Sequence, residues 1–375
     1  SETLYKSYQS QLSQNTLKEK YILTNQISLH GSRILMKIDH NSDTDLENIS
    51  FENDFPQICQ FTTEKQEYLR KQGKHVYDVM YIDVSHSLNG VLSSVENILY
   101  FQGITKTIKI YLSNVDHIFN RIFTKPLASH DEARTGFHGC ELFTKRNRSY
   151  CFLFLSETDR NSFYADINMY PQDKLLQGIQ QKWENKKLST YEYLYSLNMI
   201  TNRSFHIIQR YPIFPIILNK TETMTQLNFS NPDIFRDLSL TTFQNINKDQ
   251  INFNLISMST FPLTDVNVFK MLVRAQPFTK LEIRYQRNID TQRLFDSTEH
   301  FWPRGQDTCA PEIPPEIFTF PFYLINENGL DLGKKNHDVK LPGWCLNCFV
   351  YTSIQRVLLE SEFVRDHMME WLDFI

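Results

Sequence analysis

The stretch RSFHIIQRYPIFPII, residues 203–217, is apolar enough to be buried but cannot form a helix. Pro212 and Pro215 lack an amide proton, and each proline forces the residue before it into extended geometry. An extended segment in a protein interior needs partners for its remaining backbone polar groups. The sequence therefore predicts an irregular core segment held by helices, with three side chains as candidate partners: Asn198, Arg203 and Arg236.

A short helix is predicted immediately before this stretch. Ser189 and Glu192 have the spacing of a capping box, in which the serine hydroxyl accepts from the third amide and the glutamate returns to the cap amide. Apolar residues then recur at spacing three, at Leu194, Leu197 and Ile200, and indicate a buried face. Asn202 is well placed as the left-handed residue that ends the helix.

Length and composition indicate a packed protein of two domains. The chain has 375 residues, more than the roughly 250 to 300 at which one core usually stops growing. It is 41% hydrophobic and 22% charged with a net charge of -4, which argues against disorder and against a nucleic-acid partner. No signal-peptide core and no run of about 18 apolar residues is visible. We therefore expect a cytoplasmic protein with reduced cysteines.

The N-terminal part is predicted to be a domain of short antiparallel strands spanning residues 1–170, after a polar N-terminus at 1–15. A long polar loop at 39–76 interrupts it. A helix capped by Ser156, burying Phe163 and Ile167, is expected to close it. Seven strands and one helix are the order of a pleckstrin-homology (PH) barrel. The predicted strands are 20–27, 32–38, 77–84, 90–103, 106–112, 140–145 and 149–155.

The pattern changes to helical periodicity near residue 172, so residues 171–179 are assigned as a linker. The clearest helical segments downstream are 266–275 and 353–375, the second with Trp371 on its apolar stripe. The predicted fold class is thus α+β and multidomain: an antiparallel β-barrel with a C-terminal helix, then a mostly helical domain with an irregular extended core.

Catalytic patterns are weak throughout. Cys345 and Cys348 form a CxxC pair, but no second metal-ligand pair and no βαβ context accompany them, so packing or a free thiol is the favoured interpretation. His130, Asp131 and Glu132 are most simply a solvated turn, and His206 a core or surface histidine. We expect no catalytic residue, no metal site and no cofactor.

Several ordered blocks from residue 180 to the last residue resemble the BEACH domain family, the group of the lysosomal trafficking regulator and neurobeachin. These blocks are WENKKLSTYEYLYSLNMITNRSF, YPIFP, NPDIFRDLS, MLVRAQPFT, RLFDSTEHFW, PPEIFTFPFYLINENGLDLG and DVKLPGW. Asn202 stands where the family has glycine, Ile207 where it has aspartate and Phe322 where it has glutamate. The resemblance implies a BEACH domain at 180–375 and structural roles for ten motif residues. These are Ser189, Glu192, Asn198, Asn202, Pro212, Pro215, Arg236, Arg274, Pro277 and Trp371.

The resemblance also implies a function. A divergent PH-like domain usually precedes the BEACH domain, and a WD-repeat propeller commonly follows it in the full-length chain. The pair is expected to be a non-catalytic scaffold of vesicle trafficking or lysosome-related membrane dynamics, peripheral on endomembranes, that binds a protein or peptide partner in the groove between its domains. The groove candidates are Trp183, Tyr191, Tyr193, Arg203, Tyr211 and Phe214, for which simple core packing is the competing interpretation.

The alternative function is a membrane-surface module in which the PH-like domain recognises phosphoinositides. Such a site needs several basic residues around the loop between its first strands. The sequence offers only a sparse set, Lys18, Lys20, His30, Arg33, Arg121 and Lys125. Scattered surface charge explains this set equally well.

Overall fold

The computed structural model describes a large part of the chain after residue 74. The described residues are 75–84, 87–123, 137–145, 148–171, 175–219, 227–229, 231–238, 265–275, 277–279, 295–298, 312–326, 329, 332 and 337–373. Their contacts divide the chain into two compact units. The sheet unit contains the described residues up to Gly178 together with Met199–Ile207, and the helical unit contains Ile179–Asn198 and the described residues from Ile208 onward.

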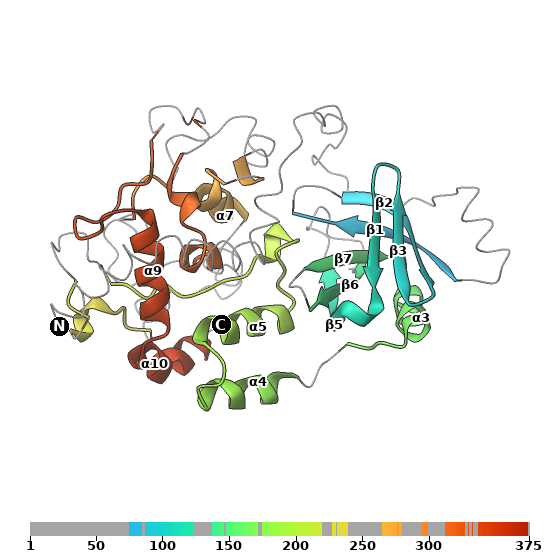
Figure 1. Cartoon of the computed structure of the whole chain (residues 1–375), viewed down its shortest axis with the longest axis horizontal. Helices are drawn as coiled ribbons and strands as arrows, with labels where there is room; N and C mark the ends of the chain where they lie inside the picture. Colours follow the sequence, from blue (N-terminus) through green and yellow to red (C-terminus); the bar gives the residue numbers. More distant parts are fainter. Residues whose placement is uncertain are drawn as a thin grey trace, which may run out of the picture. The chain divides into compact units, whose positions relative to one another are not determined.

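The sheet unit is built on one seven-stranded antiparallel sheet with the order β4-β3-β2-β1-β7-β6-β5 (Figure 1). Neighbouring strands in the sequence pair from β1 to β4 and from β5 to β7, and β1 also pairs with β7, which joins the two sets into one sheet. The strands are β1 (Val76–Ile82), β2 (Ser87–Val95), β3 (Ile98–Gly103), β4 (Thr107–Tyr111), β5 (Val115–Phe123), β6 (Phe137–Thr144) and β7 (Ser149–Phe154).

The predicted closed barrel is wrong for this part of the chain. Among the described residues β4 and β5 are the two edges of the sheet and share no ladder. They are consecutive strands joined by the 3-10 turn Leu112–Asn114, where the chain leaves one edge and starts the other.

Three strand predictions also need correction or fall outside the described residues. The predicted strand 90–103 is a hairpin, because Glu96 and Asn97 have positive φ and form a tight two-residue turn between β2 and β3. Strand β5 was not predicted. The predicted strands at 20–27 and 32–38 lie outside the described residues, as do residues 39–74 of the predicted loop 39–76; the end of that loop prediction is wrong, because Val76 begins β1.

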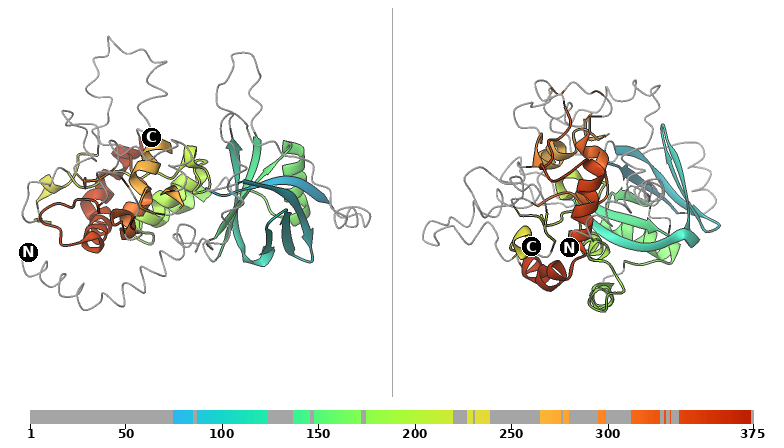
Figure 2. Two further views of the ribbon diagram at one scale, coloured as in Figure 1. Left: turned by 90° about the horizontal axis from the view of Figure 1, so that it is seen from above. Right: turned by 60° about the vertical axis from the view of Figure 1, so that its left-hand side comes forward.

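Helix α3 (Glu157–Ile167) confirms the predicted helix after the last strand. Ser156 is its N-cap, and its hydroxyl accepts from the amide of Asp159 at 3.0 Å. The helix packs on β6 and β7, as both views in Figure 2 show. Phe163 and Ile167 enter the core of the sheet unit together with Phe101, Phe152 and Phe154.

The helical unit combines separate helices with irregular chain. Its longer helices are α4 (Leu175–Glu184), α5 (Thr190–Ile200), α7 (Asp265–Leu272), α9 (Cys348–Leu359) and α10 (Glu362–Leu372). The first residues of α4 and the last two of α5 belong to the sheet unit. Short 3-10 turns lie between the helices, among them η6 (Pro315–Phe318) and η7 (Pro321–Leu324), and α9 packs on both.

The proline-broken segment is interior, as predicted. Every residue from Tyr211 to Leu218 is buried, and the segment forms no helix or strand, only isolated antiparallel bridges at Phe214 and Leu218. Asn198 on α5 holds its backbone: the side-chain amide donates to the carbonyl of Ile213 and its oxygen accepts from the amide of Ile213, both at 2.9 Å. Phe214 exchanges two backbone hydrogen bonds with Ile313. The partner role predicted for Asn198 is therefore confirmed.

The local geometry around α5 also follows the sequence. Ser189 and Glu192 form the capping box, with the Ser189 amide 3.0 Å from the glutamate and the Glu192 amide 3.2 Å from the serine hydroxyl. Asn202 has φ +63° and ends the helix in the left-handed region. The carboxylate of Glu360 accepts from the amides of Thr190 and Tyr191, so it binds the positive end of α5.

The remaining motif residues are largely internal. Arg274 is buried and donates to the backbone carbonyls of Phe295 and His337. Trp371 is buried on α10, and its indole donates to Glu312 at 3.4 Å. Pro212, Pro215 and Pro277 are buried, and the backbone amide of Arg236 donates to the carbonyl of Ile217.

Candidate functional site

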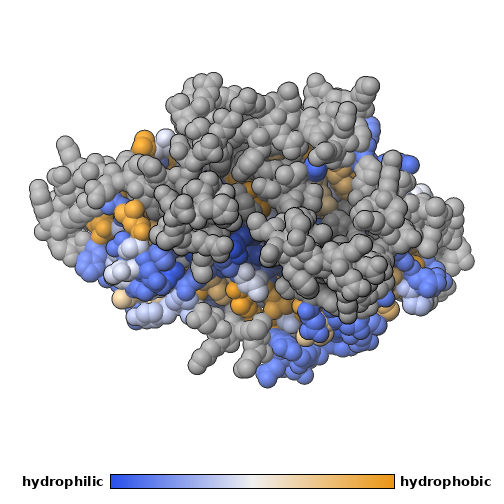
Figure 3. Space-filling view, turned by 180° about the vertical axis from the view of Figure 1, so that it is seen from behind, coloured by the Kyte–Doolittle hydropathy of each residue, from blue (hydrophilic) through white to orange (hydrophobic). Residues whose placement is uncertain are grey.

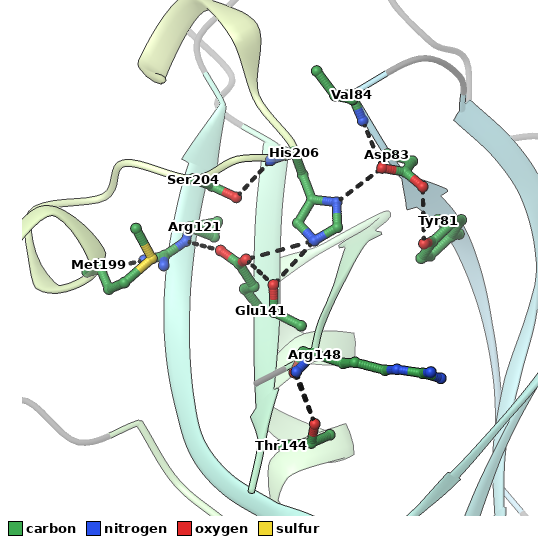
Figure 4. Close-up of polar contacts among 11 residues, drawn as sticks. Tyr81, Asp83, Val84, Arg121, Glu141, Thr144, Arg148, Met199, Ser204 and His206 are labelled. Carbon is green, nitrogen blue, oxygen red and sulfur yellow. Dashed lines mark hydrogen bonds and ion pairs between the residues drawn. The ribbon is translucent and has the colours of Figure 1, made fainter. Parts of the chain in front are cut away.

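A buried group of charged and polar side chains lies within the sheet unit, on the face of β5, β6 and β7 that is covered by residues 199–207 (Figure 4). We call it the polar cluster, and it consists of Asp83, Arg121, Glu141, Ser149 and His206. Strand register explains how the sheet contributes three of its members. Arg121 pairs with Gly139, and Glu141 pairs with Phe119 on β5 and with Cys151 on β7, so these side chains share one face.

Arg121 is the central cation of the cluster and is completely buried. Its Nε donates to a carboxylate oxygen of Glu141 at 2.7 Å, and its Nη1 donates to the carbonyl oxygen of Met199 at 2.8 Å. The guanidinium also lies over the rings of Phe119 and Phe143. Met199 is in the last turn of α5, where carbonyls lack helical partners, so Arg121 satisfies the negative end of that helix.

Glu141 balances this charge and is also buried. Its second carboxylate oxygen accepts from the hydroxyl of Ser149 at 2.7 Å. Burial alone would raise the pKa of the Glu141 carboxyl, but Arg121, His206 and the Ser149 hydroxyl hold that pKa below its usual value. Glu141 is therefore ionised at neutral pH.

His206 enters the cluster from residues 199–207. Its Nε2 is 3.1 Å from the Ser149 hydroxyl oxygen and 3.7 Å from Glu141, and its Nδ1 is 3.5 Å from the carboxylate of Asp83 at the end of β1. The backbone is set by a tight turn, in which the His206 amide donates to the hydroxyl of Ser204. The His206 side chain is 1% exposed, so it is surrounded by protein atoms.

Ser149, His206 and Asp83 follow each other in the order of a hydrolase triad, but their chemistry is different. The Ser149 hydroxyl donates its proton to Glu141, so it is not held for transfer to the histidine. The serine is also buried, which keeps a substrate away from its oxygen. The arrangement is that of an ion-pair network which attaches residues 199–207 to the sheet.

Removing one member of such a network is costly. A buried charge that loses its partner typically destabilises a protein by about 3 to 5 kcal/mol. Here both Arg121 and Glu141 are at most 1% exposed, so neither is able to turn to solvent when the other is removed. Residues 199–207 are therefore part of the fold of the sheet unit.

Five of the six predicted groove residues are buried in the helical unit. Trp183 stacks on Tyr193 with ring centroids 4.4 Å apart, and Tyr191 packs against Phe214 at 5.0 Å. The hydroxyl of Tyr211 donates to Glu316 at 2.5 Å. These contacts are those of a packed interior. Arg203 is half-buried in the sheet unit, and a partner-binding role for the set stays a prediction.

The Tyr211–Glu316 pair places a second acid in the interior. Glu316 lies in η6 and is buried, and burial raises the pKa of its carboxyl to about 7 despite the hydrogen bond from Tyr211. Burial and the nearby Glu316 carboxylate also raise the pKa of the Tyr211 hydroxyl well above its usual value. The tyrosine therefore stays protonated and remains the donor.

Of the predicted lipid-contact residues, Arg121 is wrong because its guanidinium is buried and bonded to Glu141 and Met199. Lys18, Lys20, His30, Arg33 and Lys125 lie outside the described residues. The loop between the predicted strands 20–27 and 32–38, where the lipid site was expected, also lies outside the described residues.

The cysteine pair lies in and before the first turn of α9. Burial raises the pKa of the Cys345 thiol to about 12, whereas a reactive cysteine needs a lowered pKa. Cys348 is buried. Within the described residues no group of three or more His, Cys, Asp or Glu side chains has the arrangement of a metal site. His130, Asp131 and Glu132 lie outside that part of the chain.

Sequence reasoning missed the polar cluster as a unit. A signal was available in GCELF, residues 139–143, where a single glutamate interrupts an apolar strand and needs a buried partner. His206 is buried, in line with its interpretation as a core histidine. Sequence patterns do not predict that β5 pairs with β6. This pairing places Arg121 next to Glu141.

The described surface is mixed in character. No helix among the described residues is long and apolar enough to span a bilayer. On the face shown in Figure 3, the coloured residues include both hydrophilic and apolar ones. The most exposed large apolar side chains are Ile104 in the β3–β4 turn and Leu346 before α9. Single exposed apolar residues of this kind are normal.

Comparison with known proteins agrees with the sequence blocks. The model of the Beige/BEACH domain matches residues 181–375, which is more than half of the chain. Beige protein homolog 1 of Saccharomyces cerevisiae is 31% identical over 223 residues, covering 52% of this chain and 10% of that protein. The BEACH domain-containing protein lvsD of Dictyostelium discoideum is 28% identical over 239 residues, covering 57% of this chain and 8% of that protein.

The chain belongs to the Beige/BEACH domain family, with an antiparallel sheet region preceding the domain. It spans about a tenth of the length of these curated relatives. Among solved structures, the C-terminal domain of an unknown protein from Leishmania infantum covers 28% of this chain and 93% of its own, at 14% identity and a TM-score of 0.20, a likeness too low to inform the fold.

Sequence and contacts assign residues 199–207 to different parts of the protein. By sequence they fall within the BEACH match, and by contacts they belong to the sheet unit. Hydrogen bonds and ion pairs of the polar cluster attach this segment of the BEACH match to the preceding sheet.

Proposed function

We propose that this protein is a non-catalytic scaffold of vesicle trafficking and lysosome-related membrane dynamics. Membership of the Beige/BEACH family supports the proposal, since the curated relatives are a Beige homolog and a BEACH-domain protein. We also infer that the sheet unit is a divergent PH-like domain, because seven antiparallel strands are followed by a helix that packs on the last two. The scaffold recognises a protein or peptide partner at the cytosolic face of endomembranes.

The main observation in support of the proposal is that residue types common in active sites here form a buried structural network. Serine, histidine, aspartate and glutamate meet in the polar cluster, but their protons and charges attach residues 199–207 to the sheet. The Cys345 thiol has a raised pKa and lacks the character of a nucleophile. These features fit a protein selected for a stable binding platform.

A rescue experiment in cells lacking the protein tests this function. We expect wild-type protein and the double variant Cys345→Ser, Cys348→Ser to restore the size and number of lysosome-related vesicles equally. The variant Glu141→Gln, which disturbs the buried network, should restore them poorly. Equal expression and thermal denaturation of each variant serve as controls. A folded double cysteine variant that fails to rescue would show that thiol chemistry is required and would refute the proposal.

The second candidate function is recognition of anionic lipid by the PH-like domain. One observation favours it: Ile104 is 78% exposed at the β3–β4 turn, close in sequence to Lys106 and the exposed Lys109. An exposed apolar turn residue followed by lysines is suited to a membrane surface. Co-sedimentation with phosphoinositide vesicles, compared with Ile104→Asp and repeated at increasing salt, distinguishes the two functions. Salt-sensitive binding that Ile104→Asp abolishes would favour the lipid function.

A further inference from the structure

Four buried oxygen atoms of the helical unit have no hydrogen-bond partner among the residues that the structure describes. They are Oε2 of Glu316 in η6, the hydroxyl oxygen of Tyr323 in η7, and Oγ1 of Thr352 and Oε1 of Gln355 on α9. Each of these residues is at most 4% exposed, so bulk solvent does not reach the four atoms. Buried polar groups are nearly always hydrogen-bonded, because leaving one unpaired costs free energy. These four oxygens therefore point to a bound ligand.

Packing brings the four side chains to one region of the helical unit. Helix α9 packs on both η6 and η7. Thr352 and Gln355 follow Cys348 after four and seven residues, so the three lie on one buried stripe of α9. Burial raises the pKa of the Tyr323 hydroxyl well above its usual value, and Cys348 and Glu316 are among the neighbouring groups that add to this rise. Tyr323 therefore lies near both the stripe and Glu316.

The chemistry of the four groups matches that of water. The hydroxyls of Tyr323 and Thr352 need an acceptor, and Oε1 of Gln355 needs a donor. The free oxygen of Glu316 needs a donor when the carboxyl is ionised and an acceptor when it is protonated. Water serves all of these groups because it both donates and accepts, and buried water typically makes about three hydrogen bonds. We propose that the region between α9, η6 and η7 binds ordered water, which connects these four side chains.

The water site connects the proline-broken segment to α9. Tyr211 in that segment donates to the other carboxylate oxygen of Glu316. Glu316 therefore binds the segment through one oxygen and the water through the other, and the water in turn binds Thr352 and Gln355 on the helix. This inference goes beyond the proposed function, because it concerns a ligand of the domain interior rather than a partner protein.

A high-resolution crystal structure of the wild-type chain is the direct test. We expect density for at least one water molecule at about 2.7 to 3.2 Å from two or more of the four oxygens. Direct hydrogen bonds among the four side chains, or a region between them without solvent density, would refute the water site. This measurement does not depend on how any variant folds.

Two variants test the same site in solution, because a hydrated site and a dry site predict opposite signs. Tyr323→Phe and Thr352→Val each remove one hydroxyl and nearly preserve the shape of the side chain. Urea unfolding is followed by tryptophan fluorescence, since all four tryptophans lie at residue 183 or later. With bound water, each variant loses a hydrogen bond, and the unfolding equilibrium constant should rise about fivefold. In a dry site each variant removes an unpaired hydroxyl, so this constant should stay unchanged or fall.

The matched control is Thr279→Val in the same unit. The Thr279 hydroxyl is buried and donates directly to the carbonyl oxygen of Val273, so its removal should raise the unfolding constant with or without water. We expect Thr352→Val to resemble this control. If Thr279→Val is destabilised while Tyr323→Phe and Thr352→Val are as stable as the wild type or more stable, the proposal is wrong.

Discussion

The Arg121–Glu141 ion pair offers the sharpest test of the structure. We consider Arg121→Met and Glu141→Gln, alone and together. Each single change leaves a buried charge with at most 1% exposure and no facing counter-ion at 2.7 Å, so each should destabilise the sheet unit by about 3 to 5 kcal/mol. The double variant removes both charges at once, and its cost should fall below the sum by about 1 to 3 kcal/mol.

The double variant should still be less stable than the wild type. The carbonyl of Met199 loses its donor, and a buried carbonyl without a partner costs about 1 to 3 kcal/mol. His206 also loses one of its two facing carboxylates, since Glu141 lies 3.7 Å from its ring.

The assay must report the sheet unit rather than the whole chain. All four tryptophans lie at residue 183 or later, so fluorescence follows the helical unit. Urea-dependent amide exchange of peptides from β5, β6 and β7 gives the unfolding free energy of the sheet. Lys186→Met and Glu362→Gln are the matched control, measured by tryptophan fluorescence because this pair lies in the helical unit. That pair has a similar 2.6 Å contact but is exposed, and we expect no measurable change. Additive single effects, with no coupling, would contradict the buried network.

The remaining predictions concern other parts of the fold. Between pH 4.5 and 7 the wild-type helical unit should lose about 3 kcal/mol of stability. The reason is that the pKa of Glu316 is about 7 in the folded protein and 4.5 when exposed, and each pKa unit is worth about 1.4 kcal/mol. Glu316→Gln should lack this loss in fluorescence-detected urea titrations, and identical pH profiles for the two proteins would refute the buried acid. Ser189→Ala removes the cap of α5 and should cost about 1 kcal/mol by the same titration, whereas no change would argue against the capping box with Glu192. A fragment of residues 75–178 should unfold more easily than the same region in the whole chain, because it lacks residues 199–207. A synthetic peptide of residues 199–207 should raise the melting temperature of this fragment. No effect of the peptide would mean that this segment is dispensable for the sheet.

Local structure was largely readable from the sequence because it depends on near neighbours. The capping box at Ser189, the left-handed Asn202 and the cap at Ser156 each involve residues within a few positions, and all three are found as predicted. The two-residue turn at Glu96 and Asn97 is equally local but was missed, because the apolar residues on both sides resemble one long strand.

Pairing across the sheet was not readable. The barrel was predicted from the order of seven strands and one helix, whereas in the structure β4 and β5, on either side of the 3-10 turn Leu112–Asn114, are the two edges of the sheet. Arg121 was named as a lipid-contact candidate because it is basic, whereas the counter-charge of Glu141 and the carbonyl of Met199 permit its burial.

The amino-acid sequence by itself determined the BEACH family, the interior position of the proline-broken segment and the caps of its helices, since these follow from ordered motifs and short-range hydrogen bonds. Only the tertiary structure decided that residues 199–207 belong to the preceding sheet, because that assignment depends on charges 20 to 123 positions apart in the chain meeting where water is excluded.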